Sequence, residues 1–162
     1  MKKNKRMPVT PPPVLSAKSG PIPVGSRKTG GGVIPCGVAL IRRERQFLIS
    51  QRNEDDTFGS FWEFPGGKKN PGESFENCVI REAREELGIE VLIEKKFMEI
   101  RKEYHEKIIW LNFYLCAYIS GEPRPIECQK VLWVDVADLK DYSFPPASEK
   151  VIESLFQSYG KE

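Results

Sequence analysis

The sequence of 162 residues predicts one α/β (α+β) domain built on a mixed sheet. Two observations carry this prediction. Extended segments rich in apolar residues are interspersed with two segments of helical period. One extended segment, residues 108–119, is apolar on both of its alternating faces, as expected for a central strand that is covered on each side. We therefore expect a sheet whose two faces are both buried.

The elements follow from runs of strand-forming and helix-forming residues bounded by turn signals. In chain order, strands are expected at residues 33–42, 46–51, 61–64, 89–103, 108–119 and 131–135. Helices are expected at 74–87 and 147–159, with a turn at 137–141. The first helix has the strongest signals, because its apolar residues recur every four positions. Ser74 can cap its N-terminus, and Gly88 stands where a C-terminus favours a residue that tolerates positive φ.

The first 33 residues differ in composition from the rest and are expected to form a disordered leader before a domain at 34–162. They contain seven Lys or Arg, no acid, six prolines and five glycines, which cannot build a core. The remainder has 18 basic and 23 acidic residues, a balance of −5. The leader could contact nucleic acid or a partner, although a solvated extension or a start at Met7 is the simpler interpretation. It lacks the apolar segment of a signal peptide.

Composition excludes several other classes of protein. No apolar run approaches the ~18 residues that a membrane span requires, so no membrane association is expected. The four cysteines show no C-x-x-C spacing, and the chain has one histidine, so zinc and a disulfide framework are not expected. Cys116 falls in an apolar strand and is expected in the core. A reduced, cytoplasmic setting fits these features.

Three carboxylates on the first helix are the main functional signal. Glu82, Glu85 and Glu86 stand at positions i, i+3 and i+4, where like charges repel each other by ~0.2–0.5 kcal/mol per pair in an isolated helix. A hard cation such as Mg²⁺ or Mn²⁺ would offset that repulsion. Arg81 can pair with Glu85 one turn on. A solvated acidic face remains the alternative if the helix is considered alone.

The wider spacing around this helix resembles a known signature. From Gly67 the pattern runs through Glu73 to the segment Arg81-Glu-Ala-Arg-Glu-Glu-Leu-Gly-Ile89. It is identified as that of the Nudix hydrolases, which cleave a nucleoside diphosphate linked to another group. Ala83 is the one departure, being small where a larger aliphatic residue is usual, and it should affect packing more than chemistry. The resemblance implies a Nudix α/β/α sandwich whose glutamates face a cleft.

Within the family, the resemblance is closest to the MutT-type 8-oxo-dGTP diphosphatases and covers about 125 residues. It includes the stretch Trp62-Glu-Phe-Pro-Gly-Gly-Lys68, the segment Gly121-Glu-Pro123, Trp133, and Phe144-Pro-Pro-Ala-Ser-Glu149. The last of these resembles the segment that closes over the base in MutT-type enzymes. The resemblance therefore extends well beyond the signature around the helix.

The resemblance implies a metal site. The Gly66 carbonyl and the carboxylates of Glu82, Glu85 and Glu86 would bind Mg²⁺, or Mn²⁺, with Glu127 as a further ligand from a separate loop. Glu122 competes with Glu127 for that role. The clustered Glu82 and Glu86 would supply the base, without a choice between them. Two further residues would complete the catalytic group. Glu73 would support the loop before the helix or handle a proton, and Arg81 would orient Glu85.

The resemblance also implies a substrate pocket, and here the sequence departs from the family. Ser148 replaces an asparagine that reads the purine edge, and its hydroxyl is shorter. Lys107 lacks the bidentate fork of the arginine it replaces. Phe64, Trp62 and Phe144 are candidate stacking surfaces, with burial in the core as the alternative. The full set of candidate substrate-binding residues is Arg52, Glu63, Phe64, Glu106, Lys107 and Ser148.

The leading expectation is a nucleoside triphosphate pyrophosphohydrolase that converts 8-oxo-dGTP to the monophosphate and pyrophosphate. Such an enzyme would sanitise the nucleotide pool and limit mutation during DNA replication, a form of DNA repair. A Nudix hydrolase of CTP-type nucleotides, dinucleoside polyphosphates or RNA 5′-triphosphate ends is the alternative, followed by a non-catalytic base-binding module. The partner would be a small nucleotide, and monomer and dimer both remain open.

Overall fold

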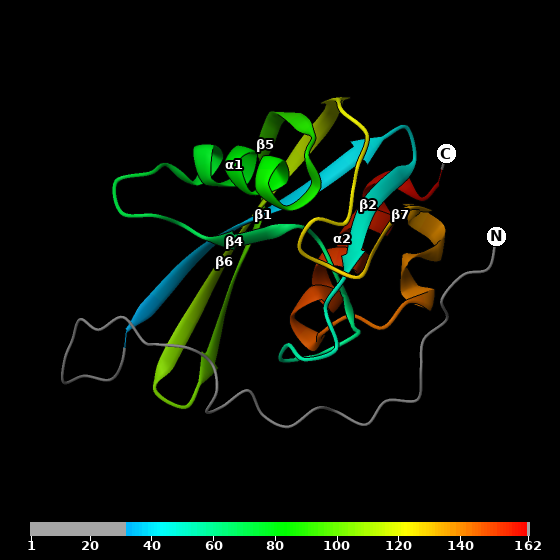
Figure 1. Ribbon diagram of the computed structural model, residues 1–162. Coiled ribbons are helices and arrows are strands. Elements are labelled where there is room, and N and C mark those ends of the chain that lie inside the picture. The colour runs from blue at the N-terminus through cyan, green and yellow to red at the C-terminus, as the bar shows by residue number, and fades with distance from the viewer. Residues whose placement is uncertain (1–31, 162) are drawn as a thin grey trace.

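A mixed sheet of seven strands forms the centre of the fold (Figure 1). The computed structural model describes residues 32–161, so the predicted leader lies outside the described residues except for its last two positions. The main path of the sheet is β3-β2-β1-β6-β5, with β4 paired to β1 and β7 paired to β2. The strands are β1 (Val33–Arg43), β2 (Gln46–Gln51), β3 (Trp62–Glu63), β4 (Gly66–Lys68), β5 (Glu90–Tyr104), β6 (Lys107–Ser120) and β7 (Lys130–Asp135). The helices are α1 (Phe75–Leu87), the 3-10 turns η1 (Val136–Asp141) and η2 (Pro146–Ser148), and α2 (Glu149–Tyr159).

The predicted strands and helices are confirmed, each within two residues of its expected bounds. β6 lies in the interior of the sheet, between β1 and β5, which agrees with its two apolar faces. It runs parallel to β1 and antiparallel to β5. The sheet is therefore mixed, as the sequence predicts.

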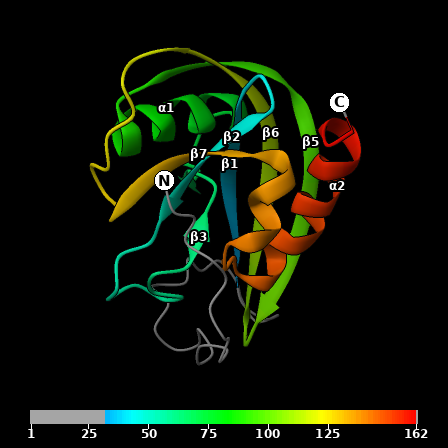
Figure 2. The same cartoon turned by 90° about the vertical axis from the view of Figure 1, so that its right-hand side faces the viewer.

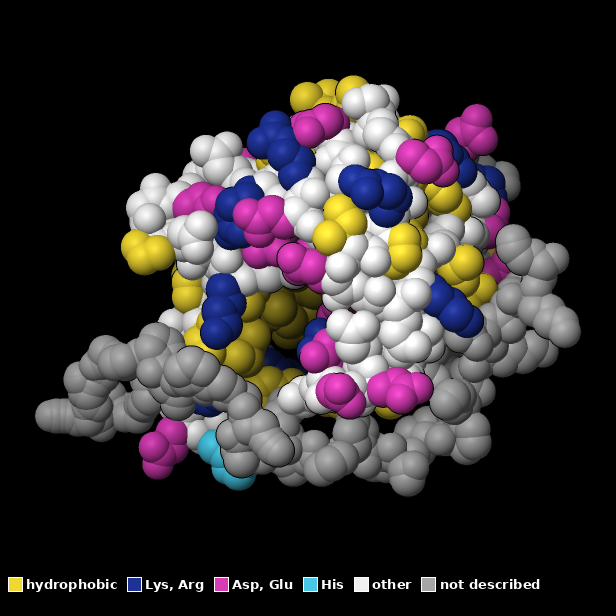
Figure 3. Space-filling model, in the orientation of Figure 1, with side chains coloured by type: hydrophobic (Ala, Val, Ile, Leu, Met, Phe, Trp, Pro, Cys, Tyr) yellow, Lys and Arg dark blue, Asp and Glu magenta, His cyan; other side chains and the backbone are white. Residues whose placement is uncertain are grey.

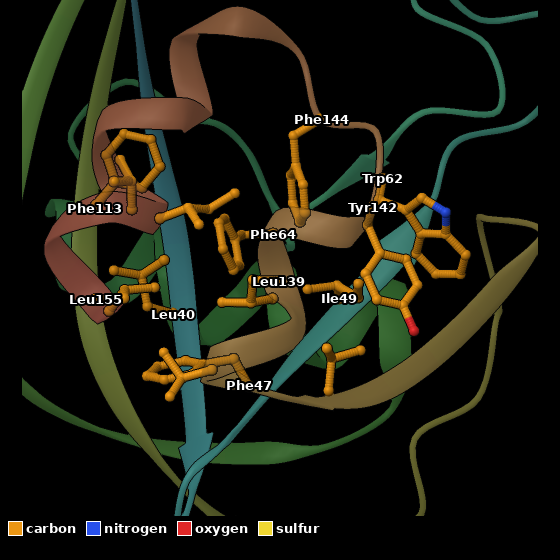
Figure 4. Close-up of a cluster of buried hydrophobic side chains, with 14 of the residues drawn as sticks. Leu40, Phe47, Ile49, Trp62, Phe64, Phe113, Leu139, Tyr142, Phe144 and Leu155 are labelled. Atoms are coloured by element: carbon orange, nitrogen blue, oxygen red, sulfur yellow. The ribbon is translucent and has the colours of Figure 1, made fainter. Parts of the chain in front are cut away.

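Helices cover both faces of the sheet (Figures 1 and 2). On one face, α1 packs Val79, Ala83 and Leu87 against alternate residues of β1 and β6. On the other face, η1 and α2 pack against Leu40 and its neighbours in a cluster that is rich in aromatic residues (Figure 4). Two separate cores result, with the sheet between them. This is the α/β/α sandwich that the resemblance implies.

The ends of α1 are fixed by the predicted caps. The Ser74 hydroxyl accepts a hydrogen bond from the backbone N–H of Asn77 at 3.0 Å. Gly88 has a φ of 72°, and its N–H donates to the carbonyl of Arg84 at 2.9 Å. Ala83 is fully buried against the sheet. Ala83 therefore belongs to the core between α1 and the sheet.

One strand is not predicted from the sequence. Residues Gly66–Lys68 form β4, which pairs antiparallel with β1 and carries the chain from the pocket to α1. Glycine-rich segments have low intrinsic strand propensity, so the sequence indicates only a loop here. Position 66 requires a glycine, because its backbone lies close to β1 and a Cβ atom here would be 2.4 Å from the carbonyl oxygen of Gly37.

The cysteines and the hydropathy of the helices complete the description. All four cysteines are free, and Cys116 is buried in the core as predicted. Among residues 32–161, none of the helices combines the length and the apolar character that would be needed to cross a bilayer.

Candidate active site

Arg81 is the centre of a partly buried ion-pair network between α1 and the end of β4. Its Nε and Nη2 atoms donate to the two carboxylate oxygens of Glu73 at 2.7 and 3.0 Å. Its Nη1 atom donates to Glu82 and to Glu85, both at 3.1 Å. Nη2 also reaches the carbonyl of Lys68 at 3.0 Å, at the end of β4. The predicted pair with Glu85 is present, and the same guanidinium serves two further carboxylates.

Glu73 supports the loop that leads from β4 to α1. One of its carboxylate oxygens accepts a hydrogen bond from the backbone N–H of Asn70 at 2.9 Å, and both accept from Arg81. The Arg81 and Asn70 hydrogen bonds lower the pKa of Glu73 to about 2. A carboxyl with so low a pKa stays ionised near neutral pH. Of the two roles expected for Glu73, loop support is therefore favoured over proton transfer.

Glu82 and Glu86 lie on the side of α1 that faces β4. The Oε1 atom of Glu86 accepts a hydrogen bond from the backbone N–H of Gly66 at 3.2 Å. Burial is the main cause that raises the pKa of Glu86, to about 9, and the charges of Glu63 and Glu82 add to it. Burial also raises the pKa of Glu82, against the opposing effect of Arg81. A bound cation would offset the mutual repulsion of carboxylates that are crowded in this way.

Gly67 leaves room for one of these carboxylates. A Cβ atom at Gly67 would lie 2.4 Å from the Oε2 atom of Glu82. The side chain of Glu82 therefore occupies the space that any other residue would fill. This explains why a glycine stands at the start of the signature, fifteen residues before Glu82.

Glu127 lies in the loop between β6 and β7, and its charge is among those that raise the pKa of Glu86. Glu127 is exposed, and so is the competing candidate Glu122 at the start of the same loop, but Glu122 is not among those charges. The backbone N–H of Ile126 donates to the carbonyl of Glu86 at 3.2 Å and holds this loop beside α1. The geometry favours Glu127 over Glu122 as the loop carboxylate of the site.

The carboxylates are near one another but do not already form a complete metal cluster. Within residues 32–161, no three His, Cys, Asp or Glu side chains converge as ligands of one ion would. Glu85 is 53% exposed and turned toward Arg81. The donors that lie inward are Glu82, Glu86 and the backbone of β4, and all of them offer oxygen atoms, which suit a hard divalent cation.

A pocket of about 300 Å³ is lined in part by Glu63, whose charge contributes to the raised pKa of Glu86. Figure 3 shows this face of the molecule, where acidic side chains lie along the rim of a hollow with hydrophobic walls. The apolar lining comes from β1, β6 and the segments after β3 and η1: Val38, Phe64, Ile109, Leu111, Phe113 and Pro145. Its polar groups are Arg52, Thr57, Glu63, Tyr104 and Ser148. An apolar cavity with few polar groups is typical of a small-molecule site.

Four of the six predicted substrate-binding residues line this pocket, namely Arg52, Glu63, Phe64 and Ser148. The Nη1 atom of Arg52 donates to the Oε1 atom of Glu63 at 2.7 Å, which links two of them. Glu106 and Lys107 lie instead at the turn between β5 and β6, outside the residues that line the pocket.

The aromatic candidates divide in a similar way. Phe64 stacks on Phe144 with ring centroids 5.2 Å apart, and both rings are largely buried. Trp62 packs edge-on against Tyr142 in the core. Burial therefore favours the core alternative for Trp62 and Phe144, whereas Phe64 both packs in the core and lines the pocket.

Sequence reasoning missed several residues that line the pocket. Tyr104, Thr57 and Phe58 come from the end of β5 and from the loop between β2 and β3. No motif marks them. The odd-numbered face of β6 does carry a signal, because Ile109, Leu111 and Phe113 alternate on one side of the predicted central strand.

Comparison with known proteins gives a consistent assignment. The family model described as NUDIX domain matches residues 37–154. An 8-oxo-dGTP diphosphatase of Haemophilus influenzae is 39% identical over 124 residues, covering 76% of this chain and 91% of the relative. A CTP pyrophosphohydrolase of Escherichia coli is 31% identical over 117 residues, covering 72% and 87%. The solution structure of the E. coli ORF135 protein, 30% identical, covers 86% of this chain and 96% of its own, with a TM-score of 0.72.

The low pKa of Glu73 leads to a prediction about stability. Its ionised form is favoured in the folded state, so its contribution is fully present above the ordinary pKa of 4.5 and is lost as the pH falls toward about 2. We expect Glu73→Gln to be less stable than the wild type near pH 7, with a difference that narrows below about pH 4.5. Urea denaturation at several pH values measures it. Glu76→Gln, an exposed change on the same helix, is the control and should show a smaller gap. A gap for Glu73→Gln that does not vary with pH would contradict this account.

Proposed function

The chain belongs to the Nudix hydrolase family, and on that premise we propose that it hydrolyses nucleoside triphosphates to the monophosphate and pyrophosphate, with 8-oxo-dGTP as the leading substrate. The observation that carries the proposal is the arrangement of Arg81, Glu82 and Glu86 beside an apolar pocket of about 300 Å³. The relative from H. influenzae, named as an 8-oxo-dGTP diphosphatase, supports the choice of substrate.

A divalent cation is part of this proposal, with Mg²⁺ first and Mn²⁺ as a substitute. The crowded carboxyls of Glu82 and Glu86, with the glycine cradle of β4, fit such an ion. Glu85 would turn from Arg81 to join them. The proposed ligands are the Gly66 carbonyl and the carboxylates of Glu82, Glu85, Glu86 and Glu127. When bound, the cation supplies positive charge that neutralises the phosphate oxygens in the transition state.

The residues of the chain then perform three tasks. Glu82 and Glu86 form a coupled pair that accepts the proton of the attacking water, and we assign the base to the pair. Arg81 donates hydrogen bonds to Glu82 and Glu85 and so orients their carboxylates. Glu73 fixes Arg81 and the loop before α1. Water adds to one phosphorus of the α–β phosphoanhydride. The bond from that phosphorus to the bridging oxygen breaks, which releases the monophosphate and pyrophosphate.

The pocket would hold the base of the nucleotide. Phe64, Ile109 and Leu111 supply apolar surface, and Ser148 offers one hydroxyl at the rim. Arg52 and Glu63 can present a donor and an acceptor to the base or sugar. Glu106 and Lys107, at the β5–β6 turn, would reach the nucleotide only if that turn moved toward the pocket. They remain proposed contacts on the resemblance alone.

In the cell, such an activity would remove oxidised precursors from the nucleotide pool before DNA replication, and so limit mutation. The four free cysteines support a reduced, cytoplasmic setting. The proposed partner is the small nucleotide. The predicted division into a leader and a domain, contact of the basic leader with nucleic acid, and the choice between monomer and dimer remain predictions.

A second substrate has one observation in its favour. Ser148 stands where the resemblance expects an asparagine, and a hydroxyl reads a purine edge with fewer hydrogen bonds than an amide. The E. coli relative named as a CTP pyrophosphohydrolase is 31% identical. A cytidine triphosphate is therefore the alternative substrate, with the same site and the same mechanism.

The carboxylate assignment predicts a large loss of activity. Glu82→Gln and Glu86→Gln should each lower kcat by about a hundredfold or more, because the neutral amide neither attracts a cation nor accepts a proton. Pyrophosphate release with Mg²⁺ measures the loss, and thermal unfolding checks that the fold is kept. Glu76→Gln, exposed on the same helix, should retain activity. A near wild-type rate in both site variants would contradict the catalytic assignment.

The substrate proposal is tested by a panel of 8-oxo-dGTP, dGTP, CTP, dCTP, dATP and diadenosine polyphosphates, compared by kcat/KM. We expect 8-oxo-dGTP to be preferred by about a hundredfold over dGTP, which corresponds to ~2.7 kcal/mol of differential transition-state binding. A preference for cytidine nucleotides would favour the alternative substrate, and a flat profile would count against both.

Ser148 gives a prediction about selectivity. Replacing Ser148 by Asn adds an amide with both donors and an acceptor at the rim of the pocket. We expect the ratio of kcat/KM for 8-oxo-dGTP over dGTP to rise by about five- to tenfold, the effect of one good hydrogen bond. Ser148→Ala is the matched control and should not raise the ratio. An unchanged ratio in Ser148→Asn would mean that this position does not read the base.

A further inference from the structure

Two loops that serve different parts of the site are joined by hydrogen bonds. The 52–61 loop, between β2 and β3, contributes Arg52, Thr57 and Phe58 to the pocket. The 121–129 loop, between β6 and β7, carries Glu127. They lie far apart in the sequence, but the pairing of Gln51 with Lys130 places the start of the 52–61 loop beside the end of the 121–129 loop.

On one side, the 121–129 loop is fixed to the end of α1. The backbone N–H of Arg124 donates to the carbonyl of Leu87 at 3.0 Å, and that of Ile126 donates to the carbonyl of Glu86 at 3.2 Å. These bonds use carbonyls that a helix leaves unpaired at its C-terminus. Glu127 therefore follows directly after a residue that is bound to the catalytic helix.

On the other side, two amide side chains join the loop to the pocket wall. The Nδ2 atom of Asn53 donates to the backbone carbonyl of Glu127 at 3.2 Å. The Nε2 atom of Gln129 donates to the carbonyl of Arg52 at 2.8 Å and to the hydroxyl of Ser60 at 3.1 Å. The Gln129 backbone N–H also donates to the carbonyl of Gln51 at 2.9 Å.

The 52–61 loop needs such support, because its backbone is strained. Phe58 and Ser60 have φ values of 59° and 65°, in the left-handed region that non-glycine residues seldom adopt. Gln51 holds the same loop from within, since its Nε2 atom donates to the carbonyl of Ser60 at 3.0 Å. The side-chain amide of Gln51 bonds to the 52–61 loop, whereas the side chains of Asn53 and Gln129 connect this loop to the 121–129 loop.

We propose that Asn53 and Gln129 are positioning residues that couple occupation of the base pocket to the placement of the Glu127 carboxylate. A base that fits against Arg52 and Phe58 holds the 52–61 loop in its strained form, and Asn53 then fixes the backbone of Glu127 next to Glu86. A base that fits poorly leaves Glu127 displaced. Selectivity is thereby expressed in kcat as well as in KM. This inference rests on the proposed function, because it needs a nucleotide in the pocket and a role for Glu127.

The first test uses Asn53→Ala and Gln129→Ala, with Gln157→Ala, which removes an exposed amide on α2, as the control. Asn53 and Gln129 are exposed, so both variants should keep the fold. With the triphosphate that the wild type hydrolyses fastest, we expect kcat to fall about three- to tenfold in both variants, the effect of one or two hydrogen bonds. Gln157→Ala should leave kcat unchanged. An unchanged kcat in both variants, or an equal loss of kcat in Gln157→Ala, would overturn the coupling.

A double-mutant cycle separates coupling from a general structural role. If Asn53 and Gln129 act through Glu127, Asn53→Ala and Gln129→Ala should change kcat by less than about twofold in a Glu127→Gln background. Losses of the same size in both backgrounds would overturn the proposal. Absence of pyrophosphate release by the wild type would instead overturn the proposed function, so the two failures are distinguishable.

A measurement without metal tests the coupling directly. Amide hydrogen exchange is followed with and without the product 8-oxo-dGMP in EDTA, or with the monophosphate of the preferred substrate. In the wild type we expect nucleotide to protect both the 52–61 loop and the 121–129 loop. In Asn53→Ala and Gln129→Ala, protection should be confined to the 52–61 loop. Protection confined to that loop in the wild type would overturn the proposal.

Discussion

The site depends on holding several carboxylates together against their mutual repulsion. Glu82, Glu85 and Glu86 are one helical turn or less apart, and burial makes the charged forms of Glu82 and Glu86 costly. Arg81 offsets part of that cost by donating hydrogen bonds to Glu82 and Glu85, and Glu73 in turn holds Arg81 in place. The Arg81 guanidinium also donates to the carbonyl of Lys68 in β4. It therefore helps to fix the position of β4 relative to α1. The pattern of charges thus affects the position of β4 as well as the electrostatics of the site.

β1 connects the two halves of the site through the alternation of its side chains. Gly37 lies under α1, where a Cβ atom would come within 3.0 Å of Cys78 and Val79. The close approach that this glycine permits brings the carboxylates of the helix down to β4, which pairs with β1 at the same place. The next residue, Val38, points to the opposite face and lines the pocket. One strand therefore fixes both the catalytic helix and the wall against which a base would lie, so their relative placement is determined by backbone geometry that side-chain motion cannot alter.

Much of this arrangement could be predicted from the sequence, and the exceptions have physical reasons. The period of Phe75, Val79, Ala83 and Leu87, with the caps at both ends, fixes α1, and the charge spacing along it indicates the ion pair between Arg81 and Glu85. β4 escaped because its glycines are selected for close approach and have no strand propensity. The parallel pairing of β1 with β6 and the hydrogen bonds from Asn53 and Gln129 escaped because they join residues that are far apart in the chain. Local periodicity carries no information on such contacts.

The polar groups of the pocket suggest which contacts can discriminate among bases. Arg52 and Glu63 already satisfy each other at 2.7 Å, so a base gains from this pair only to the extent that it improves on an existing ion pair. Ser148 adds one hydroxyl, and the remaining walls are apolar and accept any flat ring of suitable size. In the proposed reaction the carboxylate network, by contrast, would act on the phosphate groups that all nucleoside triphosphates share. Discrimination among bases therefore has to come from how well the ring fits between Phe64 and the 52–61 loop, because an imperfect fit there costs packing and also disturbs a strained backbone.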